Sequence, residues 1–316
     1  MAPMTTTDER RTAENLEARV VRYANLIPCL NAFVDTRTPG SDAKENFTII
    51  GPGVAENPDQ HVHIAERHGF NIGGARQPPQ CTNSQHSHDT AEVFLVHSGR
   101  WRFDFGEDGT DAQIESGPGD IVSFPIHCFR GFRNIGDTTG FLWSVLGGDD
   151  PGRVTWAPKV FELARQYGLI LLESGALIDT TLGQTVPAGD RPMAVTSRET
   201  IAALRVMHGR DEAEVLARAA SAPELGETLV IGPGGQLPAA DGFTVSRHGF
   251  AGGDSTAEVS PDAPEVVFVQ QGAVTVTTAG GAITLNRGDT MSVPAGLSRR
   301  YGSSGAAELI IVRGTA

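Results

Sequence analysis

Short runs of Val, Ile, Phe and Thr alternate with polar residues along most of the chain, and turn residues separate them. The sequence contains 38 glycines and 19 prolines, many of them at the ends of these runs. Short runs rich in β-branched and aromatic residues predict strands, and frequent turn residues between them are typical of sandwiches and barrels. The pattern therefore predicts an all-β protein.

Three segments carry helical signals instead, namely residues 14–25, 158–168 and 197–207. The first places apolar side chains along one helical face. The second opens with Pro158 and closes with Gly168, as short helices often do. The third begins with a serine that can cap a helix and has a glutamate in its first turn. We expect a few peripheral helices at these places.

The pattern of the first half of the chain returns in the second half. "TIIGPG" returns as "LVIGPG", "RHGFNIGG" as "RHGFAGGD", "AEVFLVHSG" as "PEVVFVQQG" and "GDIVSFP" as "GDTMSVP", always in the same order. A fixed order of matches is the signature of an internal repeat. We therefore predict two β domains at residues 45–148 and 228–316. They would follow an N-terminal helical extension (1–44) and be joined by a helical and loop linker (149–227).

Composition narrows the class of partner. The chain has 316 residues and a formal net charge of −13, which argues against a nucleic-acid-binding surface. No stretch approaches the ~18 consecutive apolar residues of a membrane span, and the N-terminus has no apolar core of a secretory signal. Three cysteines at positions without metal-ligand spacing fit a reducing compartment. We expect a cytoplasmic protein.

Two histidines one residue apart stand before an apolar stretch that ends at Gly99. On a strand, His86 and His88 point to the same face, so both can bind one ion. A slight bend would bring Glu92 to that face as well. Two neutral imidazoles and one carboxylate suit Fe(II), Mn(II), Ni(II) or Zn(II). The alternative is a metal-free barrel in which both histidines lie at a solvated strand end.

At these residues the sequence resembles the cupin superfamily of small jelly-roll barrels. The first motif of that superfamily reads G-x5-H-x-H-x3,4-E-x6-G, and "HSHDTAEVFLVHSG" reproduces it from His86 to Gly99 without the leading glycine. The second motif reads G-x5-P-x-G-x2-H-x3-N, and "GDIVSFPIHCFRGFRN" supplies Gly119, Pro125 and Asn134 at the required spacing. The resemblance implies a bicupin with a metal in its N-terminal barrel.

The sequence departs from the second motif at its histidine, which would be the fourth ligand. Arg130 stands there, and His127 replaces the inner glycine of the motif. A guanidinium is a cationic donor and cannot ligate a cation. Either the site has three protein ligands, which resembles the 2-His-1-carboxylate triad of iron oxygenases, or His127 supplies the fourth. Arg130 could anchor a substrate carboxylate or enolate, or it could be structural, since Arg299 occupies the same place in the second copy.

That second copy has lost its histidines. Val259 and Pro261 stand where the first copy has its ligand pair, and only Glu265 remains. We expect a barrel without a metal.

Three more residues are candidates for contact with a substrate. Gln85 directly precedes the ligand pair, and Trp101 and Phe103 alternate with charged residues on the strand after Gly99. An aromatic lining would suit a flat substrate, although packing in the core is the commoner role of such a stripe.

The resemblance implies a metal-dependent oxygenase, with Fe(II) favoured, that cleaves a C–C bond of a small aromatic or dicarbonyl substrate. One alternative is an isomerase, lyase or decarboxylase that uses the ion as a Lewis acid without O₂. Another is a non-catalytic cupin that only binds a ligand. The expected partner is a small molecule, with no nucleic acid or membrane, and the chain is a possible homodimer.

Overall fold

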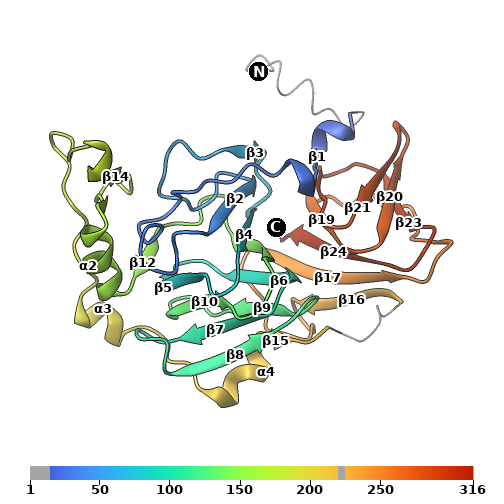
Figure 1. The fold of residues 1–316 in the computed structure, drawn as a ribbon. Helices are drawn as coiled ribbons and strands as arrows, with labels where there is room; N and C mark the ends of the chain where they lie inside the picture. Colours follow the sequence, from blue (N-terminus) through green and yellow to red (C-terminus); the bar gives the residue numbers. More distant parts are fainter. Residues whose placement is uncertain (1–14, 220–224, 316) are drawn as a thin grey trace.

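The computed structural model describes residues 15–219 and 225–315. It contains two β barrels side by side, with the C-terminal barrel on one side of the N-terminal barrel and most of the linker on the opposite side (Figure 1). The predicted all-β class with a few peripheral helices is confirmed.

The N-terminal barrel has a seven-stranded and a five-stranded sheet. Its strands are β2 (Glu45–Ile50), β3 (Val62–Ile64), β4 (Phe70–Gln77), β5 (Thr82–His88), β6 (Glu92–Ser98), β7 (Trp101–Phe105), β8 (Ala112–Ser116), β9 (Ile121–Phe124), β10 (Arg130–Asn134), β11 (Gly140–Gly147), β12 (Val154–Trp156) and β15 (Leu216–Ala217). The larger sheet has the order β15-β9-β6-β11-β4-β2-β3, and the smaller has the order β12-β5-β10-β7-β8.

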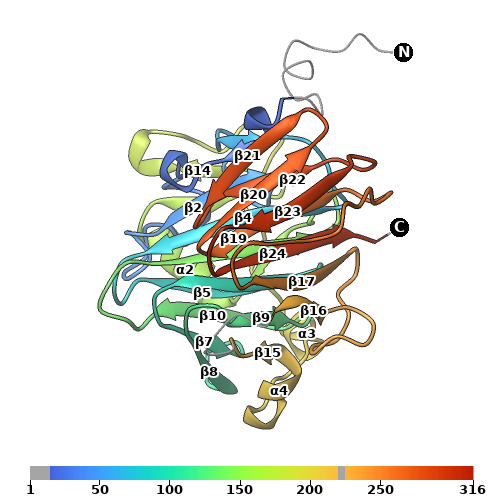
Figure 2. The same cartoon turned by 90° about the vertical axis from the view of Figure 1, so that its right-hand side faces the viewer.

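The C-terminal barrel repeats this plan with a six-stranded and a four-stranded sheet. Its strands are β1 (Val20–Val21), β16 (Gly226–Ile231), β17 (Phe243–Phe250), β18 (Asp254–Ser255), β19 (Glu265–Gln271), β20 (Ala273–Thr278), β21 (Gly281–Asn286), β22 (Thr290–Val293), β23 (Arg299–Ser303) and β24 (Ala307–Gly314). The sheet orders are β1-β22-β19-β24-β17-β16 and β18-β23-β20-β21. Figure 2 looks onto this barrel.

The register of the strands corrects one of the sequence matches. Phe70 opens β4 and pairs with Gly147 at the end of β11, while Phe243 opens β17 and pairs with Gly314 at the end of β24. The structural counterpart of Phe70 is therefore Phe243, and not Phe250 of the second "RHGF". The repeated tetrapeptide lies at different places in the two barrels, so that match was wrong although the duplication is real.

The large sheets of the two barrels share one apolar cluster, which includes side chains from β2, β4, β6 and β11 of one barrel and from β16, β17, β19 and β24 of the other. Trp143 stacks on Phe268 across this boundary, with ring centroids 4.9 Å apart. The Trp143 indole also donates to the hydroxyl of Thr290. The boundary therefore has the composition of a protein core, as obligate interfaces do.

Each barrel also receives an edge strand from the segment that precedes the other barrel. β1, from the N-terminal extension, pairs with β22, and β15, from the linker, pairs with β9. This pairing overrides the helix predicted at residues 14–25. Of the described part of that segment, Glu17–Arg19 and Tyr23–Asn25 form 3-10 turns (η1, η2) around β1. The β-branched Val20 and Val21 suit a strand, and an open sheet edge was available for them.

Most of the linker lies beside the five-stranded sheet, whereas α4 (Glu212–Val215) contacts β9 and β15 of the seven-stranded sheet. The linker also contains α2 (Pro158–Gln166), β13 (Leu169–Leu171), β14 (Leu177–Asp179), α3 (Arg198–Ala202) and the 3-10 turns η3 (Thr180–Leu182) and η4 (Gly209–Asp211). Ser197 caps α3 as predicted, accepting from the Thr200 N–H. Both predicted helices form, but α3 ends earlier than residue 207. Within the described residues, no helix has the length and apolar character needed to cross a membrane.

His97 lies at the boundary between the barrels and provides a test of it. Its ring contacts Tyr23, Phe141 and Phe268, and its Nδ1 lies 3.1 Å from the side-chain oxygen of Gln270. Burial lowers the pKa of His97 to about 4, whereas an unfolded histidine titrates near 6.5.

Acidification from pH 6.5 toward pH 4 should therefore destabilise the protein. In this window the unfolded state binds a proton at His97 that the folded state does not, so up to about 3 kcal/mol of unfolding free energy is lost as pH falls. Denaturant titrations at several pH values should show a shallower loss in His97→Gln than in the wild type. If the unfolding free energy fell equally steeply with pH in both proteins, His97 would not be the group responsible.

Candidate metal centre

The three predicted ligands come from both sheets of the N-terminal barrel. His86 and His88 lie on β5 of the five-stranded sheet, where they pair with Trp156 and Val154 of β12. Glu92 opens β6 in the seven-stranded sheet. The chain turns at residues 89–91, so Glu92 faces the histidines from the opposite sheet instead of sharing their strand face. The site therefore lies between the two sheets.

The ligand atoms of these residues lie within 4.8 Å of one another, and all three side chains are buried. His88 Nε2 is 3.7 Å from Glu92 Oε1, and the two imidazole centroids are 5.1 Å apart. Two imidazoles and a carboxylate brought together in this way are a donor set for a divalent transition metal. The alternative of histidines at a solvated strand end is inconsistent with their burial.

Hydrogen bonds of the rings indicate which nitrogens face the ion. His86 Nδ1 is 2.7 Å from the carbonyl oxygen of Ser84, and because a carbonyl only accepts, this nitrogen carries the proton. Its Nε2 therefore keeps a lone pair for a metal, the usual arrangement of a histidine ligand. His88 Nδ1 is buried without a hydrogen-bond partner among the described residues. A buried polar atom without a hydrogen-bond partner is unusual, and a bound ion or ligand in the site is one explanation for it.

Electrostatics keep both rings neutral. Burial lowers the pKa of His86 and of His88 well below the usual histidine value, and the nearby positive charge of Arg130 lowers both pKa values further. Only the neutral imidazole has a lone pair to donate to a metal. The site is thus prepared to bind a cation at neutral pH.

Arg130 lies behind Glu92 and is 1 % exposed. Its Nε and Nη2 donate to Glu92 Oε2 at 3.1 and 2.5 Å, and its Nη1 donates to the carbonyl oxygens of His86 and Cys128. One of the two predicted roles of Arg130 was to anchor a substrate. In that role it would have to break some of these hydrogen bonds. Its geometry matches the structural alternative.

His127, the possible fourth ligand, stands apart from the cluster. Its side chain is 53 % exposed and lies 3.4 Å from Asp89, and its backbone has the left-handed φ of 54°. Its N–H donates to the carbonyl oxygen of His88. The turn after Pro125 therefore directs this imidazole away from the three ligands.

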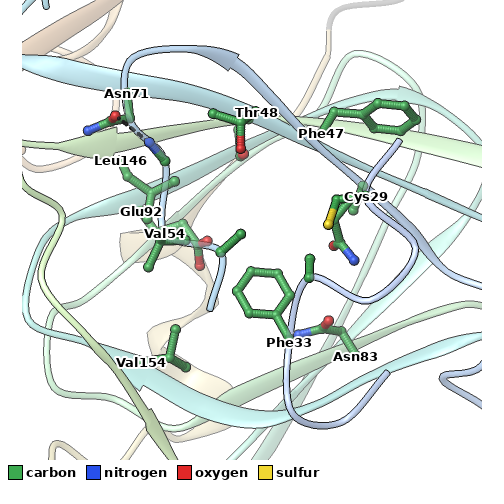
Figure 3. Close-up of a pocket in the computed structure, with 18 of the residues that line it drawn as sticks. Cys29, Phe33, Phe47, Thr48, Val54, Asn71, Asn83, Glu92, Leu146 and Val154 are labelled. Carbon is green, nitrogen blue, oxygen red and sulfur yellow. Dashed lines mark hydrogen bonds between the residues drawn. The ribbon is translucent and has the colours of Figure 1, made fainter. Parts of the chain in front are cut away.

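A cavity of about 70 Å³ lies in front of the ligands (Figure 3). Its walls come from both sheets, and two segments from outside the barrel strands cover it, residues 29–33 and 53–55. Gly53 has a φ of 70°, and its N–H donates to the Asn71 side chain. A Cβ on Gly53 would lie 2.7 Å from the Thr48 hydroxyl oxygen, so this part of the cover requires glycine.

The lining of the cavity is aromatic and amide-rich. Among the described residues that line it, none is Lys or Arg, and Glu92 is the carboxylate. Phe33, Phe47, Phe94, Phe132 and Trp156 supply the rings, and Asn46, Gln60, Asn71 and Asn83 supply the amides.

The other predicted substrate contacts lie elsewhere. Gln85 donates to the carbonyl oxygens of Asp104 and Gly106 and lines a separate groove next to α2. Trp101 and Phe103 are fully buried in the barrel core. None of the three is among the residues that line the cavity. As contacts of a substrate at the metal they stay predictions that the geometry does not favour.

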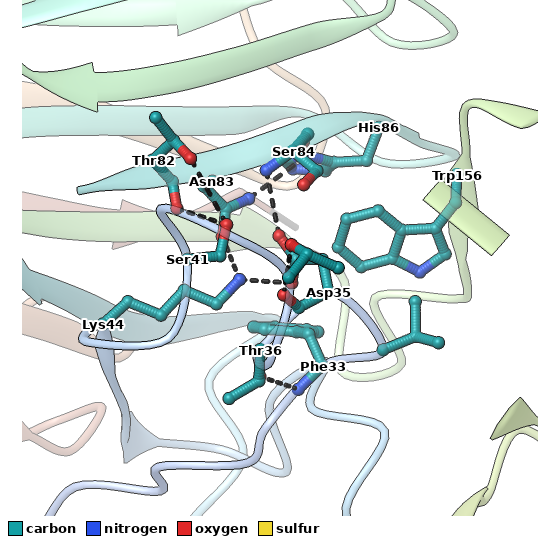
Figure 4. A network of polar contacts seen from close by, with 12 residues as sticks. Phe33, Asp35, Thr36, Ser41, Lys44, Thr82, Asn83, Ser84, His86 and Trp156 are labelled. Atoms are coloured by element: carbon teal, nitrogen blue, oxygen red, sulfur yellow. Dashed lines mark hydrogen bonds and ion pairs between the residues drawn. The ribbon is translucent and has the colours of Figure 1, made fainter. Parts of the chain in front are cut away.

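Several residues that support the site gave no sequence signal. Lys44 is fully buried, forms an ion pair with Asp35 and donates to the Asn83 side chain at 2.8 Å (Figure 4). Asp35 also accepts from the Ser84 N–H at 2.9 Å. This network holds β5 immediately before His86. Its members are distant in sequence, so no spacing pattern could have connected them.

The C-terminal barrel shows what remains when the histidines are lost. Val259 forms a bridge to Arg299, as His86 pairs with Arg130 in the first barrel. The predicted equivalence of these positions is therefore correct. Within the described residues, the one metal-type cluster of His, Cys, Asp and Glu is that of the N-terminal barrel.

Comparison with known proteins agrees with the fold. Residues 75–145 match the cupin domain family. No curated protein matches the chain by sequence. Three similar solved structures are oxalate decarboxylase from Lactobacillus farciminis, the pirin YhhW from Escherichia coli in complex with nickel(II), and salicylate 1,2-dioxygenase from Pseudaminobacter salicylatoxidans.

The similarity to these structures extends over most of the chain at low identity. The decarboxylase is 11 % identical, with 93 % of this chain and 85 % of that chain covered and a TM-score of 0.54. The pirin is 9 % identical, with 93 % of this chain and 97 % of that chain covered and a TM-score of 0.54. The dioxygenase is 15 % identical, with 78 % of this chain and 70 % of that chain covered and a TM-score of 0.51. At these identities the similarity establishes the barrel architecture alone.

The His86→Ala/His88→Ala double variant should stay folded and lose its bound metal, because both imidazoles face the cavity and the core clusters do not include them. Elemental analysis of protein loaded with Zn(II) or Mn(II) measures this directly. Glu265→Gln, in the other barrel, is the matched control and should keep the wild-type metal content. Stoichiometric metal in the folded double variant would contradict the site.

Proposed function

Because the chain is a cupin with two barrels and one three-residue metal site, we propose that it is a metal-dependent dioxygenase. It would cleave a carbon–carbon bond of a small dicarbonyl or aromatic substrate. The observation that carries the proposal is that His86, His88 and Glu92 line one cavity while His127 is not among its lining residues. Three protein ligands leave coordination positions for a substrate and O₂.

The fold by itself does not decide the reaction, since cupin-like barrels serve several chemistries. Salicylate 1,2-dioxygenase, oxalate decarboxylase and a nickel-binding pirin share this architecture. The donor set favours Fe(II) among the candidate metals, with Mn(II), Ni(II) and Zn(II) as alternatives. A bound Fe(II) would supply the one-electron chemistry that a reaction with O₂ requires.

The cavity restricts the size of the substrate. At about 70 Å³ it is roughly half of the ~150 Å³ that accommodates benzene in a protein interior. A small dicarbonyl compound in its enol form therefore fits better than an aromatic ring. The aromatic walls and the covering segments exclude water around it, which protects reactive species from hydrolysis.

Asn46 can hold the substrate. It lines the cavity, is 9 % exposed, and its Nδ2 has no hydrogen-bond partner among the described residues. An unsatisfied buried amide is costly unless a ligand pairs with it. We assign it to a carbonyl oxygen of the substrate. Since Lys and Arg are missing from the described lining, neutral donors of this kind would provide the protein's polar contacts.

The cytoplasmic location and the possible homodimer stay predictions.

The Fe(II)-loaded protein should consume O₂ with three-carbon dicarbonyl compounds, and more slowly with phenols, because the former have fewer non-hydrogen atoms and the cavity admits them more easily. An oxygen electrode and mass analysis of the products provide the measurement, with the His86→Ala/His88→Ala variant as the inactive control. Turnover by the Zn(II)-loaded protein under strict anaerobiosis would instead identify a Lewis-acid enzyme. Ligand binding without turnover would identify a binding protein.

Asn46→Ala should raise KM for an active substrate while metal content stays at the wild-type level. Loss of one hydrogen bond worth roughly 0.5–1.5 kcal/mol predicts about a three- to tenfold increase. Steady-state kinetics and elemental analysis of the same preparation test this. An unchanged KM would remove Asn46 from the substrate site.

A further inference from the structure

Arg130 directs two donors at one oxygen of Glu92. Both Nε and Nη2 donate to Oε2, whereas Oε1 lies 3.7 Å from His88 Nε2. Glu92 lines the cavity, and Arg130 is not among its lining residues. The two oxygens of one carboxylate are thus used differently: the guanidinium holds Oε2, and Oε1 faces the other ligands.

The guanidinium is itself fixed. Nη1 donates to the carbonyl oxygens of His86 at 3.4 Å and Cys128 at 3.3 Å. The ring of Phe124 lies against its other side, with Cζ 5.5 Å from the ring centroid. Because these partners belong to β5, to the segment before β10 and to β9, a rotation of Arg130 would break contacts to several parts of the barrel at once.

The same pair exists in the barrel without histidines. Arg299 Nε and Nη2 contact Glu265 Oε1 at 3.0 and 2.5 Å, and Arg299 Nη1 donates to the carbonyl oxygen of Val259. The ion pair therefore forms in a barrel that lacks the two histidines, so its formation does not require them. In the N-terminal barrel the metal site is built onto it.

The two barrels differ in the further hydrogen bonds that Glu265 and Glu92 accept in addition to those from the arginine. In the C-terminal barrel Tyr301 donates its hydroxyl to Glu265 Oε1, the same oxygen that Arg299 holds, and Arg313 donates to Oε2 at 2.9 Å. By strand register Arg313 corresponds to Leu146. Tyr301, two residues after the arginine, corresponds to Phe132, the second residue after Arg130. Leu146 and Phe132 line the cavity and have no polar side-chain atom to occupy the carboxylate.

We propose that Arg130 is a positioning residue that holds Glu92 by Oε2 so that Oε1 alone is presented to the metal, and that the apolar Leu146 keeps Oε1 free. The inference rests on the metal site of the proposed function but not on the reaction. It explains why an arginine occupies the place of the fourth histidine: it controls a ligand instead of being one. Hydrogen-bond partners of ligands commonly orient them in this way.

Arg130→Lys tests positioning without changing the charge. A lysine keeps the positive charge but loses the planar fork that places two donors on one oxygen. Co(II) affinity, measured calorimetrically at mildly alkaline pH, should weaken by about tenfold or more. The visible absorption spectrum of bound Co(II), which reports the ligand geometry, should change. Arg299→Lys is the matched control and should alter neither readout.

A second variant adds a contact instead of removing one. Leu146→Gln places a neutral amide donor where Arg313 contacts the free oxygen of Glu265, so Oε1 becomes occupied without an added charge. Co(II) should then bind at least about tenfold more weakly, although all three ligands remain. Leu146→Met, which changes the same side chain without adding a donor, is the matched control.

Two results would overturn the proposal. One is a folded Arg130→Lys protein with the wild-type Co(II) affinity and spectrum, which would leave Arg130 a purely structural role. The other is a folded Leu146→Gln protein that binds Co(II) as the wild type does, which would show that Oε1 is not the presented oxygen. Because Co(II) binding needs no turnover, these outcomes are distinct from a failure to consume O₂.

Discussion

The buried ion pair between Glu92 and Arg130 is the interaction on which the site depends. It joins β6 of the seven-stranded sheet to β10 of the five-stranded sheet, so it closes the barrel where the ligands meet. Removing one partner of such a pair commonly costs about 3–5 kcal/mol, because the other charge is left buried and uncompensated. The pair recurs as Glu265 and Arg299 in the barrel without the histidines, which indicates that this closure does not depend on a metal site.

The cavity is closed by parts of the chain that do not belong to the barrel strands. Phe33 and Val54 line it and also pack against the linker cluster around Val160. Trp156 contacts both the metal site and the segment that covers it. Its ring lies 5.3 Å from that of His86, and its indole donates to Glu56. The linker is therefore a wall of the site.

Duplication gave the two barrels different tasks. Their large sheets share an apolar cluster, and each barrel receives an edge strand from the segment that precedes the other. Exchanged edges leave fewer unpaired strands exposed to other chains. In the C-terminal barrel, Tyr301 and Arg313 satisfy the carboxylate internally, so polar burial is compensated without an ion. That barrel contributes a rigid partner surface while the other keeps the cavity.

The sequence by itself determined the fold class, the duplication and the candidate ligand set, because these depend on short-range patterns: strand alternation, turn residues and the spacing of His86, His88 and Glu92. It misplaced one repeat and predicted a helix where Val20 and Val21 pair with a distant edge, since register and edge pairing are properties of the assembled sheets. The sequence also left open whether Arg130 anchors a substrate or is structural, because its contacts depend on the assembled sheets. A guanidinium can anchor a substrate or hold a carboxylate, and only the tertiary structure brings it to Glu92 with two donors on one oxygen.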